Sequence, residues 1–136
     1  MGTLKEMLAN DRFAVNAGVE LLEIQPGYAK ARMLITQNHL NAGGVCQGGA
    51  LFTLADLAFA AVANSHQKLT LSLNANIAFL RPAREGYVYA EAFETFNHAR
   101  APFIEVRIVD EEQLLDAVLT STGYRKSEEL DVDSLE

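Results

Sequence analysis

The stretch LFTLADLAFAAVAN, residues 51–64, is typical of a single helix that is apolar on nearly every side. It is too short to span a bilayer, which needs about 20 apolar residues, so we expect it to form the core of a globular domain. Its only formal charge is Asp56, which is also the only one between Met33 and Gln67. A carboxylate there is costly unless it is paired, exposed at a cleft, or used in chemistry. Asp56 is therefore the first candidate functional residue.

Length, charge and cysteine content limit the class of protein. The chain has 136 residues, of which 49% are hydrophobic, as expected for one domain. Its net charge of −7, without a basic cluster, argues against a nucleic-acid partner. One cysteine and no apolar leader or spanning segment predict a cytoplasmic protein with no membrane association. The three histidines lack the spacing of metal ligands, so we expect no metal site.

Hydrophobic periodicity predicts the elements on either side of the helix. Residues 4–13 predict one short amphipathic helix, and Pro26-Gly27 predicts a type II turn between strands at 19–24 and 29–35. Four strands are predicted after the helix, the first of which has one apolar face; they lie at 69–79, 87–96, 104–108 and 114–125. We expect one domain over residues 1–126 and a frayed, acidic tail over residues 127–136.

This order of elements predicts an α+β fold, because the apolar helix can bury itself only across a curved antiparallel sheet. Residues 41–56, NAGGVCQGGALFTLAD, closely resemble the signature of phenylacetate-pathway (PaaI-type) acyl-CoA thioesterases. That signature has an Asn, then His-Gly-Gly six residues later, then an Asp eight residues after the first Gly. The resemblance covers roughly residues 19–126 and implies the hotdog fold, in which the sheet wraps around one long central helix.

The resemblance also implies a function and a set of site residues. Four residues match the signature, namely Asn41, Gly48, Gly49 and Asp56, while Gln47 replaces the usual His and Ser72 falls where many members keep Ser or Thr. The implied activity is hydrolysis of an acyl- or aryl-acyl-CoA, with coenzyme A as part of the substrate and no separate cofactor. The implied assembly is a homodimer or a homotetramer made of two dimers, in which Asp56 faces the Gly48 amide of the partner.

The chemistry of such a site follows from the residues themselves. If the helix begins near Gly48, its first amides lack acceptors and carry the positive end of the helix dipole, so they form an oxyanion site. Glycine lets a carbonyl group approach the backbone closely. Asp56, two turns later, could activate water or attack the carbonyl directly, and burial would raise its pKa. The resemblance further implies that Asn41, Gln47 and Ser72 position the reactants.

Several of these residues also have a purely structural explanation. Asp56 could cap a loop or pair with an arginine, Asn41 could serve only its turn, and the glycines could only permit a tight bend. Cys46 could be a nucleophile near His39, although a lone Cys in an apolar stretch is usually a buried hydrophobe. Gln47 cannot take up a proton as a histidine would.

Binding of the rest of the substrate is predicted less directly. Three arginines near strand ends could hold the phosphates of coenzyme A or could only solubilise turns: Arg81, Arg84 and Arg100. Four residues of the central helix could shape the acyl pocket: Phe52, Leu57, Phe59 and Ala60. The competing functions are a hydratase or dehydratase acting on acyl thioesters, and a catalytically weak acyl-CoA binding protein, for which Gln47 is the main argument.

Overall fold

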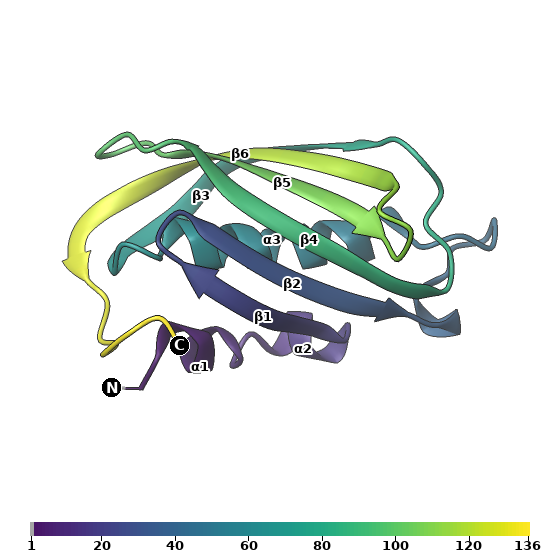
Figure 1. The fold of residues 1–136 in the computed structure, drawn as a ribbon, viewed down its shortest axis with the longest axis horizontal. Coiled ribbons are helices and arrows are strands. Elements are labelled where there is room, and N and C mark those ends of the chain that lie inside the picture. The colour runs from purple at the N-terminus through teal and green to yellow at the C-terminus, as the bar shows by residue number, and fades with distance from the viewer. Residues whose placement is uncertain (1) are drawn as a thin grey trace.

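Six strands form one curved antiparallel sheet that wraps along the helix α3, Gly48–Ala63 (Figure 1). The computed structural model describes residues 2–136. The strands lie in the spatial order β1-β2-β4-β5-β6-β3. Their bounds are β1 Val19–Gln25, β2 Tyr28–Ile35, β3 Lys68–Phe79, β4 Gly86–Phe96, β5 Phe103–Asp110 and β6 Leu115–Glu129. The predicted α+β architecture with one long central helix is confirmed.

The β1–β2 hairpin turns at Pro26-Gly27, as predicted. Gly27 has a φ of +77°, which the third position of a type II turn requires and which glycine adopts without steric cost. Tyr28 then pairs with Gln25 at the closed end of the hairpin.

Small side chains on the sheet make room for α3. Ala29 pairs with Ala92 and Ala31 with Ala90 across β2 and β4, and all four are fully buried. The helix presents further buried alanines, and larger side chains such as Leu54, Val62, Val106 and Ile108 fill the remaining core. This close packing sets which side of α3 is left uncovered. Within the described part of the chain, no helix is both long and apolar enough to cross a membrane.

The N-terminal segment differs from the single helix predicted over residues 4–13. It forms two short helices, α1 Leu4–Leu8 and α2 Arg12–Asn16. The break lies at Asp11, whose side chain accepts a hydrogen bond from the Ala14 N–H at 3.0 Å and so starts the second helix. An N-cap in the middle of the segment competes with continuation of the first helix, and hydrophobic periodicity does not reveal it.

The acidic C-terminal segment packs against the rest of the domain, whereas the sequence predicts a frayed tail. Strand β6 continues to Glu129, so the boundary expected at residue 126 falls inside a strand. Farther on, the Leu4 N–H donates to the Ser134 carbonyl at 2.9 Å. Acidic residues alternate with apolar ones that pack, partly buried, against the core, namely Leu130, Val132 and Leu135. This alternation gives the segment a face to bury, which a count of its acids does not show.

The apolar side chains of β3 are exposed, although the sequence predicts one apolar face of the kind that packs on a core. Leu71, Leu73 and Phe79 are 52%, 62% and 52% exposed. The strand lies at an edge of the sheet, and a register shift between Ser72 and Asn74 interrupts its pairing with β6. An edge strand with bare leucines is a surface that proteins normally cover.

Candidate active site

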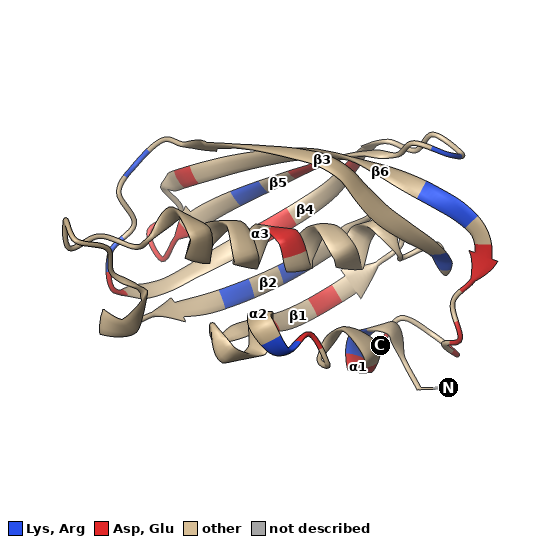
Figure 2. Ribbon diagram, turned by 180° about the vertical axis from the view of Figure 1, so that it is seen from behind, with Lys and Arg blue, Asp and Glu red and all other residues tan. Residues whose placement is uncertain are grey.

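Asp56 lies on the one uncovered stripe of α3. Its side chain is exposed, as is Gly49 two turns earlier, while Thr53 and Ala60 on the same stripe are half-buried. Figure 2 shows a single acidic position on α3, on the side of the helix away from the sheet. The expectation that the helix is buried on nearly all sides is therefore wrong along this stripe, because the sheet covers only the other sides.

The Asp56 carboxylate has no structural partner within residues 2–136. It takes part in no hydrogen bond and no ion pair with them, so it neither caps a loop nor pairs with an arginine of its own chain. Although the residue is exposed, the surrounding protein removes part of the water around its carboxylate, and this desolvation, followed by the charge of Asp11, raises its pKa above the ordinary aspartate value. An unpaired carboxylate with a raised pKa is suited to accepting a proton.

The N-terminus of α3 leaves the backbone amide of Gly48 free. Gln47 is the N-cap residue, and its side-chain oxygen accepts a hydrogen bond from the Gly49 N–H. The Ala50 N–H donates to the Gln47 carbonyl at 2.9 Å. The Gly48 N–H has no acceptor among the described residues. It therefore remains available to an oxyanion at the positive end of the helix dipole.

Gly48 also lies close to the ring of Phe79 on β3. A Cβ at this position would lie 2.8 Å from Cζ of Phe79, closer than side-chain carbons approach one another. The ring of Phe79 can pack this close to the start of the helix because residue 48 has no side chain. The same lack of a side chain keeps the neighbourhood of the Gly48 amide open to a ligand.

Gln47 has a structural role that the sequence did not predict. Its side chain caps α3 and is committed to the Gly49 amide, whereas the resemblance placed a reactant-positioning group here. The amide nitrogen of the same side chain can still donate a hydrogen bond outward. A role for Gln47 in positioning the substrate stays a prediction.

Asn41 forms the turn that precedes α3, which is the structural role predicted as the alternative to catalysis. Its Oδ1 accepts hydrogen bonds from the N–H groups of Gly43 at 2.8 Å and Val45 at 3.3 Å. Its own N–H donates to the Val45 carbonyl at 2.7 Å. The side-chain nitrogen has no acceptor within residues 2–136. The turn function is therefore observed, and a catalytic function stays a prediction.

One chain keeps the two halves of the predicted site apart. Gly48 and Asp56 are eight residues apart on α3, which corresponds to about 12 Å along the helix. Ser72 is seven residues along β3 from Phe79, which touches Gly48, so it lies about 23 Å away from that end. Its hydroxyl contacts the Ser121 hydroxyl at 3.1 Å and donates to the Asn74 carbonyl at 3.2 Å. Asp56 cannot serve the Gly48 amide of its own chain.

The three arginines do not converge. Arg81 and Arg84 line one hollow of about 420 Å³, whereas Arg100 lies in the β4–β5 loop, where its carbonyl accepts the Arg125 N–H. Arg81 lies 3.5 Å from carboxylate oxygens of both Asp110 and Asp116. Three further acids line this hollow, so five acids face its two arginines: Glu85, Asp110, Glu111, Glu112 and Asp116. This surplus of negative charge disfavours a phosphate there, and phosphate binding by these arginines stays a prediction.

Cys46 and His39 do not form a nucleophilic pair. Burial, together with the charge of Asp116, raises the pKa of the Cys46 thiol to about 11, so it is not a thiolate at neutral pH. The His39 Nδ1 accepts the Thr36 N–H at 3.0 Å, and its Nε2 donates to the Ala17 carbonyl. Both ring nitrogens are therefore occupied by the fold.

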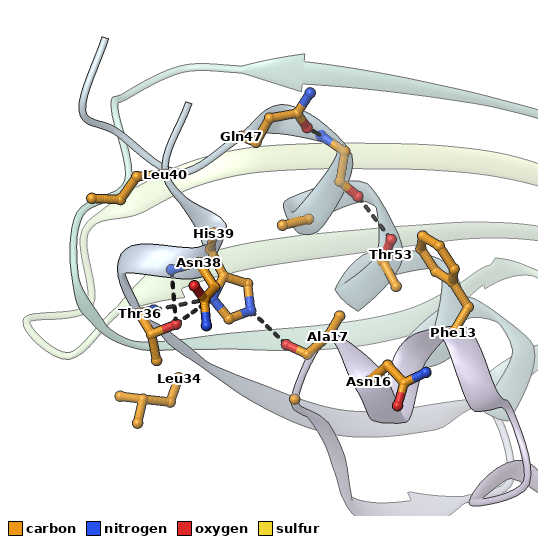
Figure 3. A pocket seen from close by; sticks show the side chains of 13 residues that line it. Phe13, Asn16, Ala17, Leu34, Thr36, Asn38, His39, Leu40, Gln47 and Thr53 are labelled. Carbon is orange, nitrogen blue, oxygen red and sulfur yellow. Dashed lines mark hydrogen bonds between the residues drawn. The ribbon is translucent and has the colours of Figure 1, made fainter. Parts of the chain in front are cut away.

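A cavity of about 650 Å³ opens beside the first turns of α3 (Figure 3). Its walls come from α2, from the end of β2, from the η1 turn Gln37–His39 and from α3. The side chains include Phe13, Leu34, His39, Leu40 and Thr53. None of the four residues expected to shape an acyl pocket lines it, since Leu57 and Phe59 point into the core. The sequence did not predict that Phe13 and Leu34 line a cavity, because each is an ordinary apolar residue of a short element.

Comparison with known sequences finds relatives along most of the chain. A family model described as the thioesterase superfamily matches residues 43–117. The acyl-coenzyme A thioesterase PaaI of Escherichia coli K12 is 29% identical over 120 residues, which cover 88% of this chain and 86% of the relative. A protein of Archaeoglobus fulgidus that is provisionally designated an esterase is 37% identical over 124 residues, 90% of this chain and 80% of that protein.

Comparison of structures gives the same result. The solved structure of the E. coli PaaI protein, from the phenylacetic acid degradation operon, matches with a TM-score of 0.88 at 29% sequence identity. The match covers 92% of this chain and 91% of that one. The sheet and the central helix described above therefore have the same arrangement in both proteins.

Proposed function

The chain belongs to the thioesterase superfamily, and on that premise we propose that it hydrolyses acyl- or aryl-acyl-coenzyme A to the free acid and coenzyme A. The resemblance to PaaI-type thioesterases and the hotdog fold predicted from residues 41–56 are confirmed. One observation carries the proposal. The chain has one free amide at the start of its central helix and one unpaired carboxylate on the uncovered stripe of that helix.

The two groups have complementary tasks in hydrolysis. The Gly48 N–H donates a hydrogen bond to the thioester oxygen and stabilises the negative charge that develops on it. Asp56 removes a proton from a water molecule that attacks the carbonyl carbon, or attacks that carbon itself to form a mixed anhydride that water hydrolyses once the thiolate has left. The carbon–sulfur bond then breaks, and the coenzyme leaves as a thiolate and takes up a proton. A thiol with a pKa of about 8.5 leaves with little acid assistance.

We place this chemistry between two chains. The exposed edge of β3 fits a second copy of β3, and a two-fold axis there would set the two central helices antiparallel. Asp56, in the middle of one helix, would then face the Gly48 end of the other, which brings the separated halves of the site together. Arg100, remote from its own Gly48, would lie toward the partner's site. A homotetramer would need a second interface, between two such dimers.

An acyl-CoA panel tests the proposed function directly. The purified protein is incubated with acetyl-, hexanoyl-, palmitoyl-, benzoyl- and phenylacetyl-CoA, and free thiol is followed with a thiol-reactive chromophore. The same protein is incubated with an enoyl-CoA, and loss of the conjugated double bond is followed. Thiol release without hydration supports the thioesterase. Hydration of the enoyl-CoA favours a hydratase. Tight binding without either reaction favours an acyl-CoA binding protein. For each of these functions, the sequence predicts a cytoplasmic location.

Gln47→His tests whether the residue at this position supplies a proton. We expect kcat/KM to change less than about tenfold between about pH 5 and 8, because the thiolate needs little acid help and Gln47 mainly caps the helix. The measurement is kcat/KM against pH with one good substrate. A larger gain that follows the titration of a histidine near pH 6.5 would support the weak-enzyme alternative.

The matched variants of this experiment separate capping from catalysis. Gln47→Ala removes the cap of α3, and we expect it to lower the free energy of unfolding by about 1 kcal/mol. Gln47→Ser restores a side-chain acceptor and should recover most of that loss. Chemical denaturation of the three proteins measures the difference.

A further inference from the structure

Two cavities flank the free Gly48 amide, and they differ in chemistry. The larger, of about 650 Å³, includes Gln47, Gly49 and Ala50 of the first turn of α3. The smaller, of about 440 Å³, includes Gly48 itself and Arg81. A thioester carbonyl bound to the Gly48 N–H would lie between them. Its acyl carbon chain and its sulfur would therefore extend in different directions.

The larger cavity suits an uncharged group. Among its lining residues there is no Lys, Arg, Asp or Glu, and apolar side chains contribute much of its surface, including Phe13, Leu34 and Leu40. Its one histidine, His39, accepts a hydrogen bond at Nδ1 and donates one at Nε2, which is the pattern of a neutral ring. Coenzyme A carries several phosphate charges, so the coenzyme would be excluded from this cavity and the acyl group admitted.

The α2 wall of this cavity is held firmly. His39 connects the turn at Thr36 to the Ala17 carbonyl at the end of α2 (Figure 3). Ala14, in the middle of α2, is buried against the core. The backbone from which a side chain projects toward the cavity is therefore fixed by contacts of the fold itself.

Phe13 is the side chain that this wall presents. It is 75% exposed, the highest fraction among the large apolar side chains of residues 2–136. Thr53 stands opposite on α3, and its hydroxyl donates to the Gly49 carbonyl at 2.8 Å (Figure 3). A phenyl ring left in water at the rim of a cavity lacks the apolar contact that its size can make. A flat ring that enters the cavity beside Phe13 would supply it.

We propose that this cavity holds the acyl group of the substrate and that Phe13 selects aromatic acyl groups by stacking. The inference rests on the proposed thioester hydrolysis and adds the residue that discriminates between acyl groups. Phe13 acts on binding of the acyl group and has no part in the bond-breaking step. Val15, on the same helix and 50% exposed, does not line the cavity and provides the matched control.

The test compares benzoyl-CoA with acetyl-CoA in the wild type, Phe13→Ala, Phe13→Tyr and Val15→Ala. We expect Phe13→Ala to lower the ratio of kcat/KM for benzoyl-CoA to that for acetyl-CoA about tenfold, which corresponds to about 1.4 kcal/mol. Phe13→Tyr should keep the ratio, since its ring can still stack, and Val15→Ala should leave it unchanged. An equal ratio in Phe13→Ala and Val15→Ala would overturn the inference while leaving thioester hydrolysis intact.

A binding measurement makes the test independent of turnover. In the Asp56→Asn background, calorimetry gives the Kd of benzoyl-CoA and of coenzyme A alone, with and without Phe13→Ala. The benzoyl group should increase affinity, and Phe13→Ala should remove about tenfold of that increase. If the wild type hydrolyses no acyl-CoA, the proposed function fails, and these constants still decide whether Phe13 binds the ring. Dissociation of the oligomer by Phe13→Ala would instead identify Phe13 as a subunit contact and contradict the inference.

Discussion

Replacing Asp56 with Asn lowers kcat for acyl-CoA hydrolysis by a factor of about 100 or more, because the amide keeps the shape of the side chain but can neither accept a proton nor attack a carbonyl. Asp56 has no hydrogen bond or ion pair within residues 2–136, so the exchange breaks no internal contact. The measurement is steady-state thiol release at saturating substrate. A variant that turns over at nearly the wild-type rate would show that Asp56 is not part of the chemistry.

The raised pKa of Asp56 predicts how kcat depends on pH. Only the ionised carboxylate is active, so kcat rises with pH, with a midpoint above the ordinary aspartate value of about 3.9. The free energy of unfolding depends on pH in the opposite direction. The folded-state pKa is above the unfolded-state value, so the contribution of Asp56 to stability is lost as the pH rises through the folded-state pKa. Asp56→Asn avoids this loss, and we expect its melting temperature at pH 7 to equal or exceed that of the wild type.

Replacing Leu73 with Asp separates the subunits and abolishes hydrolysis. Leu73 is 62% exposed on the edge strand β3, and a charge there would be buried against a second copy of the strand. Because each site needs Gly48 from one chain and Asp56 from the other, we expect kcat/KM to fall at least about 100-fold. Sedimentation reports the mass and thiol release reports the activity. Val15→Asp places the same charge on an exposed apolar residue of α2 and should change neither.

Mixing two inactive variants tests the shared site further. Asp56→Asn keeps the Gly48 amide. Gly48→Ala keeps the Asp56 carboxylate and its own backbone N–H, and we expect it to be inactive because the added Cβ, 2.8 Å from Cζ of Phe79, obstructs the approach of a thioester to that N–H. A heterodimer of the two has one intact site. Random exchange of subunits should restore about a quarter of the wild-type activity if the site crosses the two-fold axis. No recovery after verified exchange, or a fully active Leu73→Asp monomer, would place both groups in one chain and contradict the proposal.

Patterns of neighbouring residues were enough to predict much of this protein. The apolar run at residues 51–64, the turn at Pro26-Gly27 and the alternating strands predicted one helix against an antiparallel sheet, and the structure has that arrangement. The start of α3 at Gly48 was predicted as well, and with it a free amide at the positive end of a helix. These features depend on backbone conformation and local periodicity, which short stretches of sequence encode.

Features that depend on contacts between distant residues were decided only by the tertiary structure. The C-terminal segment is ordered because it pairs with Leu4, and the leucines of β3 are exposed because the strand lies at an edge of the sheet. The cavity beside Phe13 needs α2, the end of β2 and α3 to meet, and His39 to connect two of its walls. Hydrophobic periodicity does not predict these contacts. Which residues are buried, and which residues lie beside them, depends on how the elements pack together.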